Sequence, residues 1–281
     1  MTTAEPVLPT QASDVDQVLE DLRSSGVAIL TGVFGTDEIE RARRRLDEIA
    51  AAERIAGVAL HDDGRSASGE LSSGANQRVL SLITKDPIFR QMATAPALVE
   101  AARRLFAASY PYPPEVVERL QLDAVLVSSV SANIARTGGH EMELHTDQGF
   151  VPPTIGIPLI LNAVVPLVDF TVGNGATRVA PGSHVLDARQ LVAHPPTARP
   201  VEAPAGAALL IDGRTWHGTG ANRTPHPRPA VLVNYCPPWM RPFEDHDRRT
   251  VTDLAGSDAP HDRHLSELLG LRRWFVYGNT T

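Results

Sequence analysis

The spacing of hydrophobic residues predicts a helical first part of the chain. Apolar positions recur every three or four residues over 15–22 and 38–53, and helical patterning returns over 87–92 and 96–107. This period is typical of amphipathic helices. A Ser or Asp just ahead of the first stretch is a suitable N-cap. The apolar run 27–30 is short and follows a glycine, so it predicts a strand.

The pattern changes after about residue 120, where short apolar runs replace the helical period. Clusters of Gly, Pro, Asn and Asp separate these runs, which lie at 122–134, 157–165, 179–180, 207–211 and 230–235. Many short strands with regular turn signals predict a sandwich or a barrel. We therefore expect a mainly β protein with flanking helices packed on the outside.

No linker or internal repeat divides the chain, so we expect one domain over residues 1–281. Its helical part spans about 13–110, its β-rich part about 120–240, and a C-terminal extension covers 241–281. Residues 61–76 are polar and rich in Gly and Ser, and this composition predicts a loop. Such a long loop is either a lid over a site or a plain connection.

Composition excludes several classes of function. The 281-residue chain has a net charge of −7 and an isoelectric point of about 5.8, so nothing suggests nucleic-acid binding. The single cysteine, Cys236, cannot form an internal disulfide. No segment has the roughly twenty apolar residues of a membrane span, and the first twelve residues lack the pattern of a signal peptide. We expect a cytoplasmic protein, monomeric or homodimeric, that does not bind membranes.

The triplet His145-Thr146-Asp147 is the first candidate for chemistry. On an extended backbone, residues two apart point the same way, so these two side chains could bind one metal ion. Two histidines and one carboxylate on one face form the facial triad of non-haem Fe(II) oxygenases. Taken alone, such a triplet is more often a surface pair, so a third ligand must be found.

His217 is the best candidate for the third ligand. It lies just past the predicted strand 207–211, and the intervening strands can bring it back beside the triplet. Of the ten histidines, the others lie in turns, beside prolines or in charged tail sequence. His140, beside two glycines, is a fallback ligand.

Arg228 begins the last predicted strand and could bind a carboxylate together with the hydroxyl of Thr219. Arginine does this with two parallel hydrogen bonds, which lysine cannot copy. A surface salt bridge is the alternative role for Arg228. Arg223 competes with it for the carboxylate but falls in a turn.

Together these segments resemble the phytanoyl-CoA dioxygenase family, in the branch that tailors natural products. The resemblance covers about residues 15–240, and the stretch Asn174-Gly175-Ala176-Thr177-Arg178-Val179-Ala180-Pro181-Gly182-Ser183-His184 is its most specific part. The other segments that carry it are the triplet at 145–147, Leu161-Asn162, the segment 169–171, the segment 217–224 and Arg228.

The resemblance implies a double-stranded β-helix, a cupin-like jelly roll, that uses Fe(II), 2-oxoglutarate and O2. It makes His145, Asp147 and His217 the iron ligands. Arg228, Thr219 and Thr177 would bind 2-oxoglutarate. One departure is Met142, because relatives often carry a glutamine there that helps to hold 2-oxoglutarate.

The implied reaction oxidises, and most often hydroxylates, a C–H bond of a small to medium natural product, and it releases succinate and CO2. Desaturation, epoxidation and ring formation remain open. Asp147 argues against halogenation, since the related halogenases lack this carboxylate. Gln148, Phe150 and Trp239 are candidate contacts to the small-molecule substrate. The alternative function is a cupin-type jelly roll that binds a metal or ligand without 2-oxoglutarate or without catalysis, and this alternative has no need of Arg228.

Overall fold

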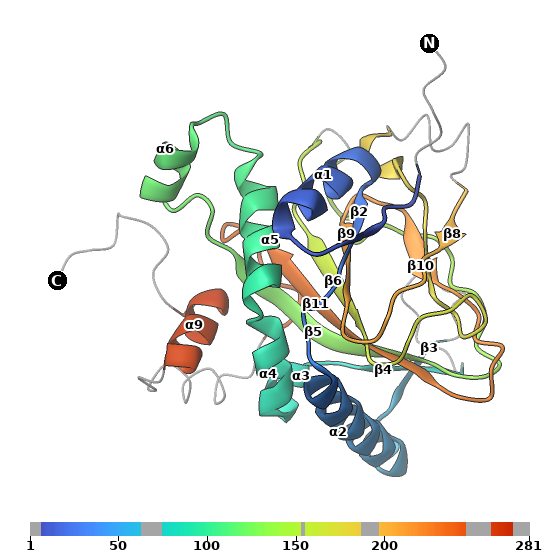
Figure 1. Ribbon diagram of the computed structural model, residues 1–281. Coiled ribbons are helices and arrows are strands. Elements are labelled where there is room, and N and C mark those ends of the chain that lie inside the picture. Colours follow the sequence, from blue (N-terminus) through green and yellow to red (C-terminus); the bar gives the residue numbers. More distant parts are fainter. Residues whose placement is uncertain (1–6, 63–74, 153–154, 187–196, 246–259, 272–281) are drawn as a thin grey trace.

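The computed structural model describes residues 7–62, 75–152, 155–186, 197–245 and 260–271 (Figure 1). Its helices are α1 (Val15–Ser25), α2 (Thr36–Ile55), α3 (Leu82–Lys85), α4 (Pro87–Ala93), α5 (Pro96–Ala107), α6 (Pro114–Arg119), the 3-10 helix η1 (Ser183–Val185) and α9 (Pro260–Leu268). The predicted helices at 15–22, 38–53, 87–92 and 96–107 are all present.

Two sheets contain the strands. The large sheet has the order β1-β2-β9-β6-β11-β5-β4-β3, and the small one has the order β10-β7-β8. The strands are β1 (Gln11–Ala12), β2 (Val27–Leu30), β3 (Leu60–Asp62), β4 (Asn76–Val79), β5 (Leu126–Ala135), β6 (Leu161–Pro166), β7 (Thr177–Val179), β8 (Arg199–Pro200), β9 (Ala208–Asp212), β10 (His217–Thr219) and β11 (Arg228–Cys236). All pairs are antiparallel except β1 with β2.

The large sheet lies between a layer of helices and the small sheet (Figure 1). One apolar cluster joins its outer face to the helices, through residues such as Leu22, Phe89 and Leu98. A second cluster fills the space toward the small sheet and includes Leu209 and Val179. Two facing sheets with helices outside form a jelly roll, as predicted.

Strand β11 shows how the side-chain alternation divides the sheet into two faces. One face carries Val231, Val233 and Tyr235, which belong to the apolar core under the helices. The other face carries Arg228, Ala230, Leu232 and Asn234, which line a cavity between the sheets. The interior of the jelly roll is therefore polar at one end, and this is where a site can form.

The segment 61–76 was predicted to be a loop throughout, and that prediction is wrong at both ends. Residues 60–62 and 76–79 pair as the antiparallel strands β3 and β4 at one edge of the large sheet. Pairing of β4 with β5, and of β3 with β4, outweighs the polar composition of these ends. The lid hypothesis concerns 63–74, which lie outside the described residues.

The C-terminal end of helix α1 packs against Thr215, two residues before His217. Helix α1 begins at its N-cap Asp14, whose carboxylate accepts from the Gln17 N–H at 2.9 Å, and it ends at Gly26. Gly26 has a φ of 76°, and a Cβ there would come within 2.2 Å of the Thr215 hydroxyl oxygen. That hydroxyl donates to the Gly26 carbonyl at 2.9 Å. Only glycine permits this close packing beside Thr215.

Over the described residues, no helix combines the length and the apolar character needed to cross a membrane.

The thiol of Cys236 should be unreactive in the folded protein. It is fully buried, and burial raises its pKa to about 12, so only about one thiol in ten thousand is ionised at pH 8. Titration with a thiol-reactive dye should give no fast reaction in buffer and one thiol per chain in guanidinium chloride. A full-amplitude reaction in buffer would contradict the placement of the C-terminal end of β11.

Candidate metal centre

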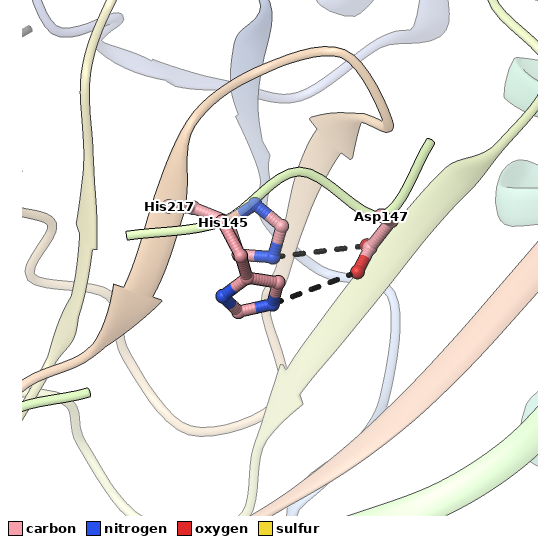
Figure 2. Close-up of side chains that lie close together, drawn as sticks. All are labelled: His145, Asp147 and His217. Carbon is pink, nitrogen blue, oxygen red and sulfur yellow. Dashed lines mark ion pairs between the residues drawn. The ribbon is translucent and has the colours of Figure 1, made fainter. Parts of the chain in front are cut away.

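The triplet residues His145 and Asp147 and the distant His217 meet at the cavity. His145, Asp147 and His217 each offer a ligand atom, and these atoms all lie within 4.8 Å of one another. Figure 2 shows both imidazoles facing the carboxylate of Asp147. His145 Nε2 lies 3.8 Å from Asp147 Oδ1, and His217 Nε2 lies 3.7 Å from Oδ2.

Backbone carbonyls fix the orientation of both imidazoles. His145 Nδ1 lies 3.3 Å from the Glu143 carbonyl, and His217 Nδ1 lies 2.9 Å from the Thr215 carbonyl. A carbonyl can only accept, so each Nδ1 carries the proton and donates it. The Nε2 lone pairs then point at the site that Asp147 faces, as metal-binding histidines require.

The chain geometry differs in part from the extended triplet that we predicted. His145 does have a strand-like partner, because its N–H donates to the His217 carbonyl and the His217 N–H donates back, both at 2.9 Å. Asp147 instead begins a turn over residues 147–150. The turn is held by the Gln148 N–H, which donates to the Gly213 carbonyl at 2.9 Å.

Gly218 allows the triplet segment to approach β10. A Cβ on this residue would come within 3.0 Å of the Met142 carbonyl oxygen and 3.1 Å of the Glu143 carbonyl oxygen. A side chain between His217 and Thr219 would therefore be crowded by the triplet backbone, and glycine at this position avoids that crowding.

The three side chains are unequally exposed. The exposed fraction is 39% for the side chain of His145, 16% for Asp147 and 6% for His217. Burial lowers the pKa of His145, and the nearby His217 lowers it further, while Asp147 acts in the opposite direction. The neutral imidazole is thus favoured, and this is the form that binds a metal.

Arg228 lies in the same cavity and is the largest fully buried side chain in the described residues. Its Cζ stacks 4.4 Å from the centre of the Phe170 ring, and its Nε and Nη2 have no hydrogen-bond partner within the described chain. Burial, followed by the charge of Arg78, lowers the pKa of Arg228 to about 9. The guanidinium is still charged at neutral pH, so this site favours an anion.

Thr219 and Thr177 lie beside Arg228 in the cavity wall. They are opposite one another in the pairing of β10 with β7, and both are buried. The Thr219 hydroxyl accepts from Asn133 Nδ2 at 2.7 Å and keeps its own proton for another acceptor. The structure therefore brings all three candidate anion-binding residues into one cavity of about 200 Å³ with the three candidate ligands.

The candidate substrate residues do not line this cavity. Gln148 is buried, with its carboxamide donating to the Ile157 carbonyl and accepting from the Leu159 N–H. Trp239 is exposed and donates to the Tyr110 hydroxyl at 3.1 Å. Phe150 is also exposed, but its ring lies 5.5 Å from that of Phe243, which does line the cavity.

Phe243 is held at the cavity by the residue that follows it. The Glu244 carboxylate accepts from the Ser81 N–H at 2.8 Å and from the Val130 N–H at 3.0 Å. The Glu244 N–H donates to the Ser128 carbonyl at 2.9 Å. These contacts fasten the segment after β11 across β5, and they place Phe243 and Phe150 as an aromatic pair beside the metal centre.

Sequence reasoning missed several polar residues of the cavity. Asn162, Asn133 and Asn234 lie on the inner face of β6, β5 and β11, and Arg78 lies on β4. An asparagine within an otherwise apolar strand is a readable signal for the first three. Arg78 has no such signal, because β4 itself was missed. The two alternatives, His140 and Arg223, are exposed and lie outside the cavity lining.

Solved structures share the fold. The epimerase SnoN, in complex with Fe3+, alpha-ketoglutarate and nogalamycin RO, matches with a TM-score of 0.60 at 20% identity, over 87% of this chain and 91% of that one. The carbocyclase SnoK of nogalamycin biosynthesis matches with a TM-score of 0.60 at 19% identity, over 86% and 92%.

Relatives are also found by sequence. "Dioxygenase af480" of Aspergillus fumigatus is 30% identical over 100% of this chain and 85% of its own length. "Dioxygenase FUM3" of Gibberella moniliformis is 28% identical over 84% and 77%. The family profile for phytanoyl-CoA dioxygenase matches residues 22–230, which is well over half of the chain. By these matches, the chain belongs to the phytanoyl-CoA dioxygenase family of enzymes.

Proposed function

We propose that this protein is an Fe(II)- and 2-oxoglutarate-dependent dioxygenase that oxidises a C–H bond of a small to medium natural product. The observation that carries this proposal is the buried, partly unpartnered Arg228 in one cavity with His145, Asp147 and His217. A metal-binding jelly roll without 2-oxoglutarate has no use for such a cation.

The donor set suits iron. Two imidazoles and one carboxylate on one face, with the other side open to a cavity, are the ligands and the geometry of non-haem Fe(II) oxygenases. His145, Asp147 and His217 would hold the metal. The two Nδ1–H contacts to backbone carbonyls keep both imidazoles in the ligating tautomer.

The cavity also suits a dicarboxylate. One carboxylate would bind at the metal, and the other would take the two unpartnered nitrogens of Arg228 and the hydroxyl proton of Thr219. Thr177 adds a second hydroxyl to this wall. Met142 has no donor to offer where relatives often carry a glutamine. Arg78 Nη2 lies 3.9 Å from the Met142 sulfur and brings a second cation to the cavity.

When bound, iron and 2-oxoglutarate together activate O2 to oxidise the substrate. The chain's own residues bind, orient and exclude water. Arg228 and Thr219 fix one end of the cosubstrate, and the walls of β5, β6 and β11 close the inner side of the cavity. The aromatic pair Phe150 and Phe243 borders the site and offers apolar surface to a substrate.

Hydroxylation is the reaction we favour, with other oxidations of the same class as alternatives. Support for a natural-product substrate comes from SnoN and SnoK, which act in nogalamycin biosynthesis. They are an epimerase and a carbocyclase, so one fold serves several outcomes.

The direct test is cosubstrate turnover without added substrate. Purified protein with Fe(II), 2-oxoglutarate and O2 should form succinate slowly, and a chelator should stop it. Succinate is measured by mass spectrometry against a reaction without iron. If 2-oxoglutarate neither binds nor is consumed while the metal binds, the cupin-type alternative is the better function.

Replacing either His145 or His217 with Ala should remove Fe(II) binding and leave the protein folded, because the apolar core does not include the metal site. Isothermal titration with Fe(II) under anaerobic conditions measures the binding, and circular dichroism checks the fold. His140→Ala is the matched control and should bind the metal normally. Normal Fe(II) affinity in His217→Ala would remove this residue from the ligand set.

Arg228→Ala should weaken 2-oxoglutarate binding and leave metal binding almost unchanged. Removing one partner of a buried, hydrogen-bonded ion pair costs about 2–5 kcal/mol, which is about thirtyfold to a few thousandfold in Kd. Arg228→Lys should recover part of the affinity, since a lysine cannot form the paired hydrogen bonds.

The control for Arg228 is Arg223→Ala, which removes an exposed charge and should leave the Kd for 2-oxoglutarate unchanged. Binding is measured by titrating 2-oxoglutarate into the metal-loaded protein. A Kd within about twofold of the unmutated value in Arg228→Ala would rule out this cosubstrate site.

A further inference from the structure

Asn162 is a buried carboxamide in the middle of the large sheet. It lies on β6, where it is opposite Ile211 of β9 on one side and Asn234 of β11 on the other. Its residue is 2% exposed, and its sequence neighbours Leu161 and Ala163 belong to the apolar core. A carboxamide in such a place destabilises the fold unless it is hydrogen-bonded, so its contacts point to its role.

The partner of Asn162 is a candidate metal ligand. Asn162 Nδ2 donates to Asp147 Oδ2 at 2.9 Å. In the described part of the chain, the Asp147 carboxylate accepts no other hydrogen bond, and Asp147 belongs to a turn rather than to a strand. Each of the three candidate ligand side chains thus makes one hydrogen bond to a group that is not itself a candidate ligand. The histidines use backbone carbonyls, and Asp147 uses a side chain that a substitution can remove.

The hydrogen bond makes the two carboxylate oxygens unequal. Each carboxylate oxygen can accept at about two lone-pair sites. Asn162 occupies one of those sites on Oδ2, so Oδ1, which faces His145, is the oxygen with both sites open. Of six coordination positions, 2-oxoglutarate needs two and O2 needs one. The carboxylate must therefore ligate through a single oxygen if all three positions are to remain.

We propose that Asn162 is a positioning residue that fixes the orientation of the Asp147 carboxylate and favours its ligation through one oxygen. This inference rests on the proposed function, because it concerns the same metal site. Outer contacts of this kind typically change metal affinity by about ten- to a hundredfold when they are removed.

The test replaces the carboxamide and measures metal binding directly. Asn162→Leu keeps the number of side-chain heavy atoms and the branching at Cγ without a donor, and Asn162→Ala removes the donor without the added bulk of leucine. Co(II) serves as the probe metal, because its absorption spectrum reports its ligands and it binds without O2 chemistry. We expect both variants to bind Co(II) about ten- to a hundredfold more weakly, with a changed visible spectrum. Thermal unfolding of each variant verifies that the protein is folded.

Asn234→Leu is the matched control. Asn234 is the cross-strand partner of Asn162 in the same cavity wall, and its Nδ2 donates to the Ser129 hydroxyl rather than to a ligand. Its replacement should leave the affinity for Co(II) within about twofold and the Co(II) spectrum unchanged. An equal loss of Co(II) affinity in Asn234→Leu would mean that any substitution in this cavity wall disturbs the metal site, and it would overturn the inference.

Two other results would also overturn it. One is a loss of less than tenfold in both Asn162 variants, and the other is an unchanged Co(II) spectrum in them. If the unmutated protein fails to bind Co(II) and Fe(II), the proposed function itself is overturned. The failure of the inference and the failure of the proposed function are thus distinguishable.

Discussion

The metal centre depends on one pair of backbone hydrogen bonds, between His145 and His217. The triplet segment belongs to neither sheet, and the reciprocal 2.9 Å bonds between these two residues attach it to β10. The Met142 N–H extends the attachment by donating to the Thr219 carbonyl at 2.9 Å. Gly218 suits this position because the two backbones lie close together there.

The other constraint is a polar wall inside an apolar sandwich. The inner faces of β5, β6 and β11 carry asparagines and Arg228 where a jelly roll of the same size could pack aliphatic side chains. Such residues lower the stability of the fold, and proteins accept this at functional sites. The adjacent outer faces of the same strands are apolar and bind the helices, so one sheet provides both the core and the site.

The sequence allowed the candidate ligands and Arg228 to be proposed before the structure brought them into one cavity, because their chemistry is specific and His217 and Arg228 lie beside predicted strands. Arg228 begins β11, as predicted, whereas the short strand β10 that His217 begins was not among the predicted strands. Local patterns could mark Asn162 as a polar residue in an apolar strand, but they could not predict its hydrogen bond to Asp147 or the β3–β4 hairpin. Both depend on which strands pair, and pairing is set by tertiary contacts. For the same reason, Gln148 is next to Asp147 in the chain but contacts a different segment.

The stacking of Arg228 on Phe170 has a consequence for the whole molecule. The folded state holds a desolvated cation whose remaining donors suit a carboxylate, whereas the unfolded chain exposes the same arginine to water. A small dicarboxylate that binds only the folded form adds RT ln(1 + [L]/Kd) to the free energy of unfolding. If a dicarboxylate binds at Arg228 as proposed, the stability of the fold would rise with the concentration of that ligand, through this one guanidinium.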